Sequence, residues 1–157
     1  MKKIEITVPV TEVTMDELTD AQKAVVEAAR AATERSYAPY SHFSVGAAIL
    51  LENGEIVTGA NQENVAFPSG LCAERTACFY AGARYPDVAF RMVAIAARDA
   101  EGRLTDEPLS PCGACRQSLL EYEMRSGRPV ELLLAGASRI FIMPSVASSL
   151  PLAFREF

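Results

Sequence analysis

Three cysteines in two short segments have the residue types and spacing of a metal site. Cys112 and Cys115 are three residues apart in SPCGACRQSLLEY, and Cys72 lies near the start of GLCAERTACFYAGA. Both segments are expected to begin helices, and Ser110 before Pro111 is a helix-start signature. Free backbone N–H groups at helix N-termini favour thiolates, which select zinc over magnesium or calcium. The spacing predicts Zn²⁺ held by Cys72, Cys112 and Cys115.

The number of protein ligands separates a catalytic zinc from a structural one. Cys78 is the obvious fourth sulfur, but at about 100° per residue it is rotated roughly 240° from Cys72 and should face the core. Three ligands leave one position for water. Glu74, two residues past a ligand, can reach that water as a general base. Arg75 can hydrogen-bond a thiolate and withdraw negative charge from the sulfur.

Other interpretations of these segments remain open. A redox dithiol at Cys112 and Cys115 would leave Cys72 and Glu74 unexplained. A structural zinc site closed by Cys78 or Glu74 would make the chain a zinc-stabilised interaction module. The single histidine, His42, has no other candidate ligand near it and is expected to be a loop residue.

Composition limits the partners. The 157 residues, 50% hydrophobic and 22% charged, favour one domain over residues 1–157, and a net charge of −5 argues against binding a nucleic acid polymer. No apolar run approaches the roughly 18 residues of a membrane span, and no signal-peptide core is evident. A small-molecule substrate and a cytoplasmic location are therefore expected.

The elements that must position these residues alternate between helix and strand. An apolar stripe predicts a helix from Asp20 to about Glu34, and Asn53-Gly54 predicts a hairpin between strands at 44–51 and 55–60. The runs FRMVAIAA, VELLLAG and RIFIMP indicate strands buried on both faces. A helix beginning at Ser110-Pro111 should end near Gly127. The fold class predicted is α/β, a three-layer α/β/α sandwich with a mixed β-sheet.

The first 15 residues or so are harder to assign. IEITVPV alternates polar and apolar residues as a strand does, but Pro9 cannot donate a ladder hydrogen bond and favours a sheet edge. This segment is therefore expected to be either an edge strand or a loose N-terminal extension.

These motifs together resemble the small zinc-dependent cytidine deaminases that act on free nucleosides. The resemblance rests on CAER, PCGACRQ, YAPYSHFSVGAAI, TGANQENVAFPSGLCAERTA and the final LPLAF, and it covers roughly residues 20–157. It implies a cytidine deaminase-like fold and one Zn²⁺ on Cys72, Cys112 and Cys115. It also implies that Glu74 is base and then acid while cytidine, and also deoxycytidine, is hydrolysed to uridine or deoxyuridine plus ammonia, a step of pyrimidine salvage.

The resemblance also implies the substrate contacts. Asn61 and Glu63 match the pair that holds the ribose hydroxyls, and Phe43 matches the aromatic residue that packs on the pyrimidine. The Ala73 N–H matches the donor to the 2-oxo group. Phe154 matches a residue inserted into a neighbouring subunit's site, which implies a homotetramer or homodimer.

One departure is Phe67, where the family usually has Tyr. A related cytosine nucleoside or nucleoside antibiotic is the alternative substrate, because a few contacts decide such a preference.

Overall fold

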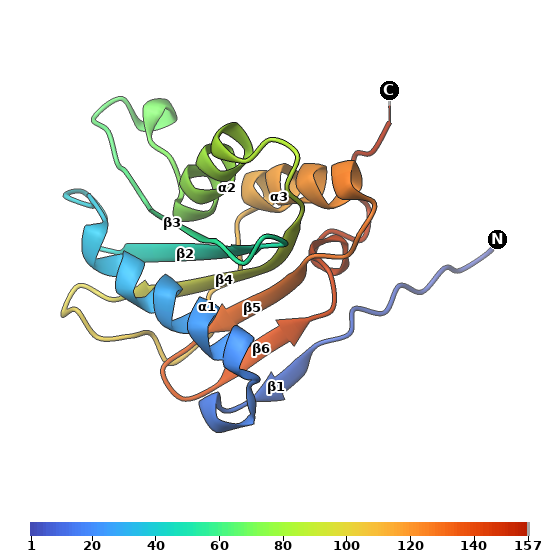
Figure 1. Cartoon of the computed structure of the whole chain (residues 1–157), viewed down its shortest axis with the longest axis horizontal. Coiled ribbons are helices and arrows are strands. Elements are labelled where there is room, and N and C mark those ends of the chain that lie inside the picture. Colours follow the sequence, from blue (N-terminus) through green and yellow to red (C-terminus); the bar gives the residue numbers. More distant parts are fainter. Residues whose placement is uncertain (157) are drawn as a thin grey trace.

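The computed structural model of the chain, which describes residues 1–156, contains one six-stranded sheet between two layers of helices (Figure 1). The strands lie in the order β1-β6-β5-β4-β2-β3, and within residues 1–156 only the β4–β5 pair is parallel. Their bounds are β1 (Thr11–Val13), β2 (Ser44–Leu51), β3 (Ile56–Ala60), β4 (Phe90–Arg98), β5 (Glu131–Ala135) and β6 (Ile140–Met143). The predicted mixed sheet is confirmed.

The hairpin between β2 and β3 forms where the sequence predicts it. Gly54 has a φ of 88°, which favours glycine, and the Asn53 side chain accepts a hydrogen bond from the backbone N–H of Glu55 at 3.1 Å. The hairpin fixes the register Leu50↔Ile56, so β3 begins one residue later than expected.

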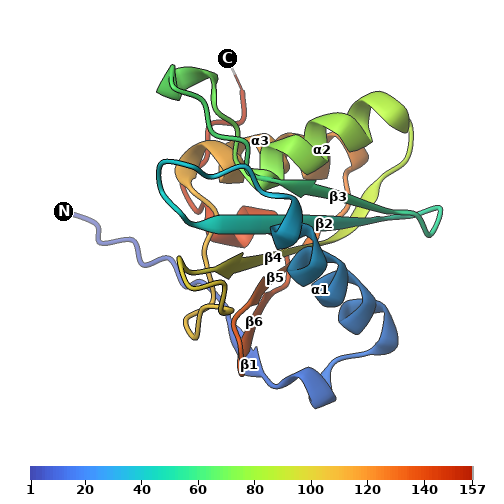
Figure 2. The same ribbon diagram turned by 90° about the vertical axis from the view of Figure 1, so that its left-hand side faces the viewer.

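Helix α1 (Asp20–Ala32) covers one face of the sheet, and α2 (Ala73–Arg84) and α3 (Gly113–Ser126) cover the other (Figure 2). The 3₁₀ turn η2 (Thr33–Arg35) follows α1 directly, so the α-helix ends two residues earlier than predicted. The Thr33 hydroxyl donates to the carbonyl of Arg30 at 2.6 Å and accepts from Nε of Arg98 in β4 at 2.9 Å. These bonds attach the end of α1 to the sheet.

The helices on the second face begin at the residues expected to do chemistry. Cys72 is the N-cap of α2 and Cys112 the N-cap of α3. Helix α3 therefore starts two residues later than the Ser110-Pro111 pair suggests, because its first backbone bond runs from Arg116 N to the Cys112 carbonyl. It ends as predicted, with Gly127 in the left-handed region at φ 64°.

The alternating IEITVPV segment does not form the strand that its pattern allows. The strand at that edge of the sheet is only Thr11–Val13, paired with β6, and residues 1–10 form neither helix nor strand. The described residues also include the 3₁₀ turns η1 (Met15–Glu17), η3 (Phe67–Ser69) and η4 (Val146–Ser149). None of the helices in residues 1–156 is long and apolar enough to cross a membrane.

Candidate metal centre and substrate pocket

The N-termini of α2 and α3 bring three sulfur atoms together. The Sγ atoms of Cys72, Cys112 and Cys115 all lie within 4.8 Å of one another. Cys115 is buried, Cys72 is half-buried and Cys112 is exposed, so the cluster opens toward solvent on one side. Cys72 and Cys112 are N-caps, and Cys115 lies in the first turn of α3. This explains why residues forty positions apart in the sequence can share one centre.

The donor set fits a zinc ion. Tetrahedral thiolate coordination at about 2.3 Å separates sulfur atoms by about 3.8 Å, within the spacing of this cluster. Burial raises the pKa of the Cys115 thiol, and burial likewise raises the pKa of the adjacent Glu74 carboxyl. A divalent cation held by the three sulfurs would stabilise both groups in their ionised forms.

Arg75 is a cation in contact with these sulfurs. Its Nη2 donates a hydrogen bond to Cys72 Sγ at 3.7 Å, and this bond is the main reason that the pKa of Arg75 is raised. Its Nε is buried without a hydrogen-bond partner among the described residues. The geometry is the one required for drawing negative charge from a sulfur ligand.

Glu74 and Cys78 share a helix but have different surroundings. Glu74 is only 3% exposed, lies in the first turn of α2 and contacts the Cys115 thiol. Cys78 is completely buried in the core, and burial raises its pKa to about 12. The sulfur cluster does not include Cys78, in agreement with its rotation around the helix.

A cavity of about 530 Å³ leads to the sulfur cluster. The residues that line it come from the loops around β2 and β3 and from the start of α2: Tyr40, Ser41, Asn61, Gln62, Glu63, Asn64, Phe67, Gly70, Leu71, Cys72 and Arg75. Its size is that of a small-molecule site. A larger cavity of about 690 Å³, near Tyr85, Tyr122 and Arg125, lies at the opposite ends of α2 and α3 and contains no sulfur ligand.

The Asn61 side chain joins three segments of the cavity wall. Its Oδ1 accepts from the Ser36 hydroxyl at 2.6 Å and from the Val45 N–H at 2.8 Å, and its Nδ2 donates to the Phe43 carbonyl at 2.9 Å. The structure thus shows an internal role for Asn61 that the sequence motif does not reveal. Phe43 is half-buried, and it is not among the residues lining the cavity.

Glu63 is held by a turn that sequence reasoning did not assign to the site. Its Oε2 accepts from the backbone N–H groups of Tyr40 at 2.8 Å and Ser41 at 3.3 Å. A hydrogen bond from the Ser41 side chain, followed by that from the Tyr40 backbone, lowers the pKa of Glu63. Tyr40 also packs edge-on against Phe67, with ring centroids 5.7 Å apart. Pro39 and Ser41 in YAPYSH are residue types that favour such a turn.

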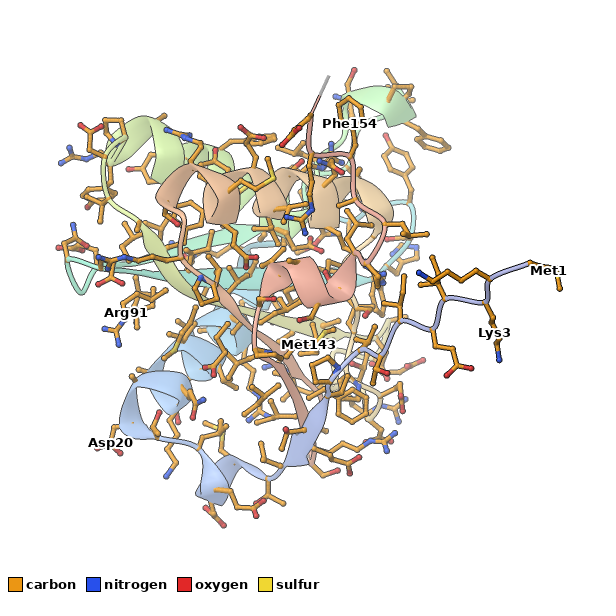
Figure 3. The ribbon with its side chains drawn as sticks, turned by 90° about the vertical axis from the view of Figure 1, so that its right-hand side faces the viewer. Met1, Lys3, Asp20, Arg91, Met143 and Phe154 are labelled. Carbon is orange, nitrogen blue, oxygen red and sulfur yellow. The ribbon has the colours of Figure 1, made fainter. Side chains whose placement is uncertain are left out.

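Two further predicted residues, Ala73 and Phe154, are not among the described residues that line the cavity. Ala73 is fully buried at the first position of α2, next to Cys72. Phe154 is 64% exposed, and its carbonyl accepts a hydrogen bond from Nε2 of Gln117 in α3 at 2.8 Å (Figure 3). Among residues 1–156, those that line the cavity do not include Phe154.

Comparison with known proteins gives one consistent family. A family model described as the cytidine and deoxycytidylate deaminase zinc-binding region matches residues 19–127. A cytidine deaminase of Sporosarcina psychrophila is 46% identical over 106 residues, covering 66% of this chain and 70% of that protein. A cytidine deaminase of Halalkalibacterium halodurans is 43% identical over 104 residues, covering 65% of this chain and 71% of that protein.

Solved structures agree with this result. The crystal structure of cytidine deaminase from Burkholderia pseudomallei superposes with a TM-score of 0.70 at 38% identity, over 87% of this chain and 100% of that chain. The crystal structure of cytidine deaminase from Mycobacterium tuberculosis gives a TM-score of 0.64 at 32% identity, over 88% of this chain and 99% of that chain. The likeness therefore extends over most of the fold described above.

Proposed function

Because this chain belongs to the cytidine and deoxycytidylate deaminase zinc-binding family, we propose that it hydrolyses free cytidine to uridine and ammonia. The observation that carries the proposal is a buried carboxylate, Glu74, beside three clustered sulfurs at a cavity of nucleoside size. Deoxycytidine is proposed as a second substrate, and a cytoplasmic location would suit a step of pyrimidine salvage.

Cys72, Cys112 and Cys115 would hold the Zn²⁺ that the family binds. When bound, this ion supplies a Lewis acid that makes water a nucleophile at neutral pH. Arg75 keeps its hydrogen bond to Cys72 and so limits the negative charge that three thiolates would place on the centre.

Glu74 moves the protons. Burial raises the pKa of its carboxyl above the ordinary value, which makes the protonated form easier to reach than in an exposed glutamate. As a carboxylate it accepts a proton from the attacking water. As a carboxylic acid it delivers this proton to ring N3. After the oxygen has added to C4, the carboxylate takes the remaining proton of that oxygen and delivers it to the amino group, which leaves as ammonia. One side chain can therefore act as base and then as acid.

The cavity wall binds and orients the nucleoside. Both backbone hydrogen bonds to Glu63 use Oε2, and Oε1 is proposed to accept from a ribose hydroxyl. Asn61 keeps the loop that carries Glu63 in place and is proposed to contact the sugar as well. The Ala73 N–H is proposed to donate to the 2-oxo group, and Phe43 to approach the pyrimidine when a ligand is bound.

The test is release of ammonia from cytidine by the purified, zinc-loaded protein. Glu74→Gln should keep its zinc and still bind a nucleoside, but lose activity by at least ~10²–10⁴-fold, as is typical when a general acid–base is removed. Near-normal turnover by this variant would contradict the role of Glu74. A zinc-loaded wild-type protein that releases no ammonia would instead favour a zinc-stabilised interaction module.

A further inference from the structure

The first ten residues, which we call the arm, extend past the end of the sheet. In β1, Thr11 pairs with Ile142, and β6 ends one residue later at Met143. Residues before Val10 therefore have no β6 residue opposite them. Figures 1 and 3 show the arm leaving the body beside β6, with Met1 far from the rest of the chain. The reaction proposed above makes no use of this segment.

The arm has one apolar face that its own chain leaves exposed. Ile4, Ile6, Val8 and Val10 alternate with polar residues and are 74%, 52%, 40% and 50% exposed. In an extended chain these side chains lie on the same side, together with Lys2 before them and Glu12 after them. The face thus begins with a cation, continues with four apolar residues and ends with an anion.

We propose that the arm pairs with the same arm of a second copy of this chain, antiparallel, about a twofold axis at Thr7. On the apolar face this register places Lys2 opposite Glu12, Ile4 opposite Val10 and Ile6 opposite Val8. Each contact then occurs twice, as an isologous interface requires. The partner is a second copy because the sequence complementary to the arm is the arm itself.

Neighbouring registers lose this match. An axis at Ile6 places Lys2 opposite Val10, and an axis at Val8 places Ile4 opposite Glu12. An axis at Glu5 brings two glutamates together. An axis between residues would set apolar side chains opposite polar ones throughout, since a shift of one residue exchanges the faces.

Pro9 is compatible with the register centred on Thr7. In an antiparallel pair, the residues that exchange N–H and C=O groups alternate along each strand. If Thr7 occupies a non-hydrogen-bonded position, the donors are the even-numbered residues, from Ile4 to Val10. Pro9, which has no N–H, then falls outside the ladder. A free two-stranded ribbon is marginally stable, so these contacts would add to others between the bodies.

Cross-linking tests the position of the axis. Thr7→Cys should give a disulfide-linked dimer under mild oxidation of the zinc-loaded chain, because residues paired at a non-hydrogen-bonded position on the axis have Cα atoms about 4.5 Å apart, which a disulfide can span. Glu5→Cys is the matched control, with introduced thiols roughly 14 Å apart in this register. Equal cross-linking of the two variants on a non-reducing gel, with the wild type alongside, would overturn the proposal.

Charge exchange tests the partner. In the Thr7→Cys background, Lys2→Glu and Glu12→Lys should each slow cross-linking at least about threefold, and the two together should restore it. The two residues are roughly 33 Å apart within one extended arm, so restoration requires a second copy. Lys3→Glu with Glu12→Lys should not restore it. If the combined Lys2→Glu and Glu12→Lys exchange does not restore cross-linking, the proposed register is wrong. Lysine-dependent binding of the arm to anionic lipid vesicles, without any cross-linked dimer, would overturn the proposal as well.

Discussion

At the scale of single residues, spacing was enough to predict which three sulfur atoms lie together. Two helix starts each place a thiol beside free backbone N–H groups, and the i, i+3 separation of Cys112 and Cys115 puts both on one face. The internal bonds of Asn61 could not be predicted, because its partners Ser36, Phe43 and Val45 lie 16 to 25 positions away. The fold alone brings them together.

Replacing single cysteines should distinguish those that bind zinc from the one that only packs in the core. Cys112→Ala should lose zinc and lower the free energy of unfolding, because metal binding is coupled to folding. Cys78→Ala should keep one zinc per chain, since Cys78 is a protonated core thiol outside the sulfur cluster. Elemental analysis of the purified variants measures both. Zinc loss in Cys78→Ala would show that the centre is closed by a fourth sulfur.

At the scale of elements, the position of the site depends on how closely α2 approaches β3. A Cβ atom built on Gly59 would lie 2.5 Å from the backbone N of Ala77 and 2.7 Å from the carbonyl O of Ala73. Only glycine permits this approach, which sets the first turn of α2, and with it Cys72 and Glu74, against the sheet. Hydrophobic patterning predicted both elements but carries no information on the distance between them.

The lack of tertiary information in a local pattern also explains why some predicted helix and strand boundaries differ from those of the structure. Ser110-Pro111 is a sound helix-start signal, yet the turn of backbone that positions Cys112 displaces the start by two residues. IEITVPV has the alternation of a strand, but pairing requires a partner, and β6 ends at Met143. Local pattern therefore determined the type of most elements, and tertiary pairing determined where they begin and end.

Gly59→Ala should destabilise the fold and displace the site. The added methyl group must push backbone atoms apart, so we expect a loss of about 1–3 kcal/mol in the free energy of unfolding, the usual cost of overpacking. Deaminase activity should fall together with stability. Gly113→Ala is the matched control, since a Cβ there has no neighbour within 4 Å and φ is not positive. Denaturant unfolding of both variants measures the difference, and equal stability would show that α2 can move away at little cost.

At the scale of the whole molecule, the proposal that a second subunit completes the cavity rests on the position of Phe154. Phe154 is largely exposed and lies outside the cavity lining of its own chain. The tail that carries it is nevertheless fixed to α3 through the bond from Gln117 to the Phe154 carbonyl. A side chain presented outward in this way is suited to entering a neighbour's site, and an assembly of two or four chains with shared sites is therefore proposed.

Mixing two disabled chains tests whether Phe154 acts on a neighbour. Glu74→Gln and Phe154→Ala proteins, each weak alone, should regain cytidine deamination when co-expressed, because some mixed assemblies then contain a site with Glu74 from one chain and Phe154 from the other. Glu74→Gln co-expressed with the double variant provides the control, since every site in that mixture lacks the carboxylate. If Phe154 acts only within its own chain, no complete site can form in the first mixture either, and its ammonia release will stay at the average of the two variants.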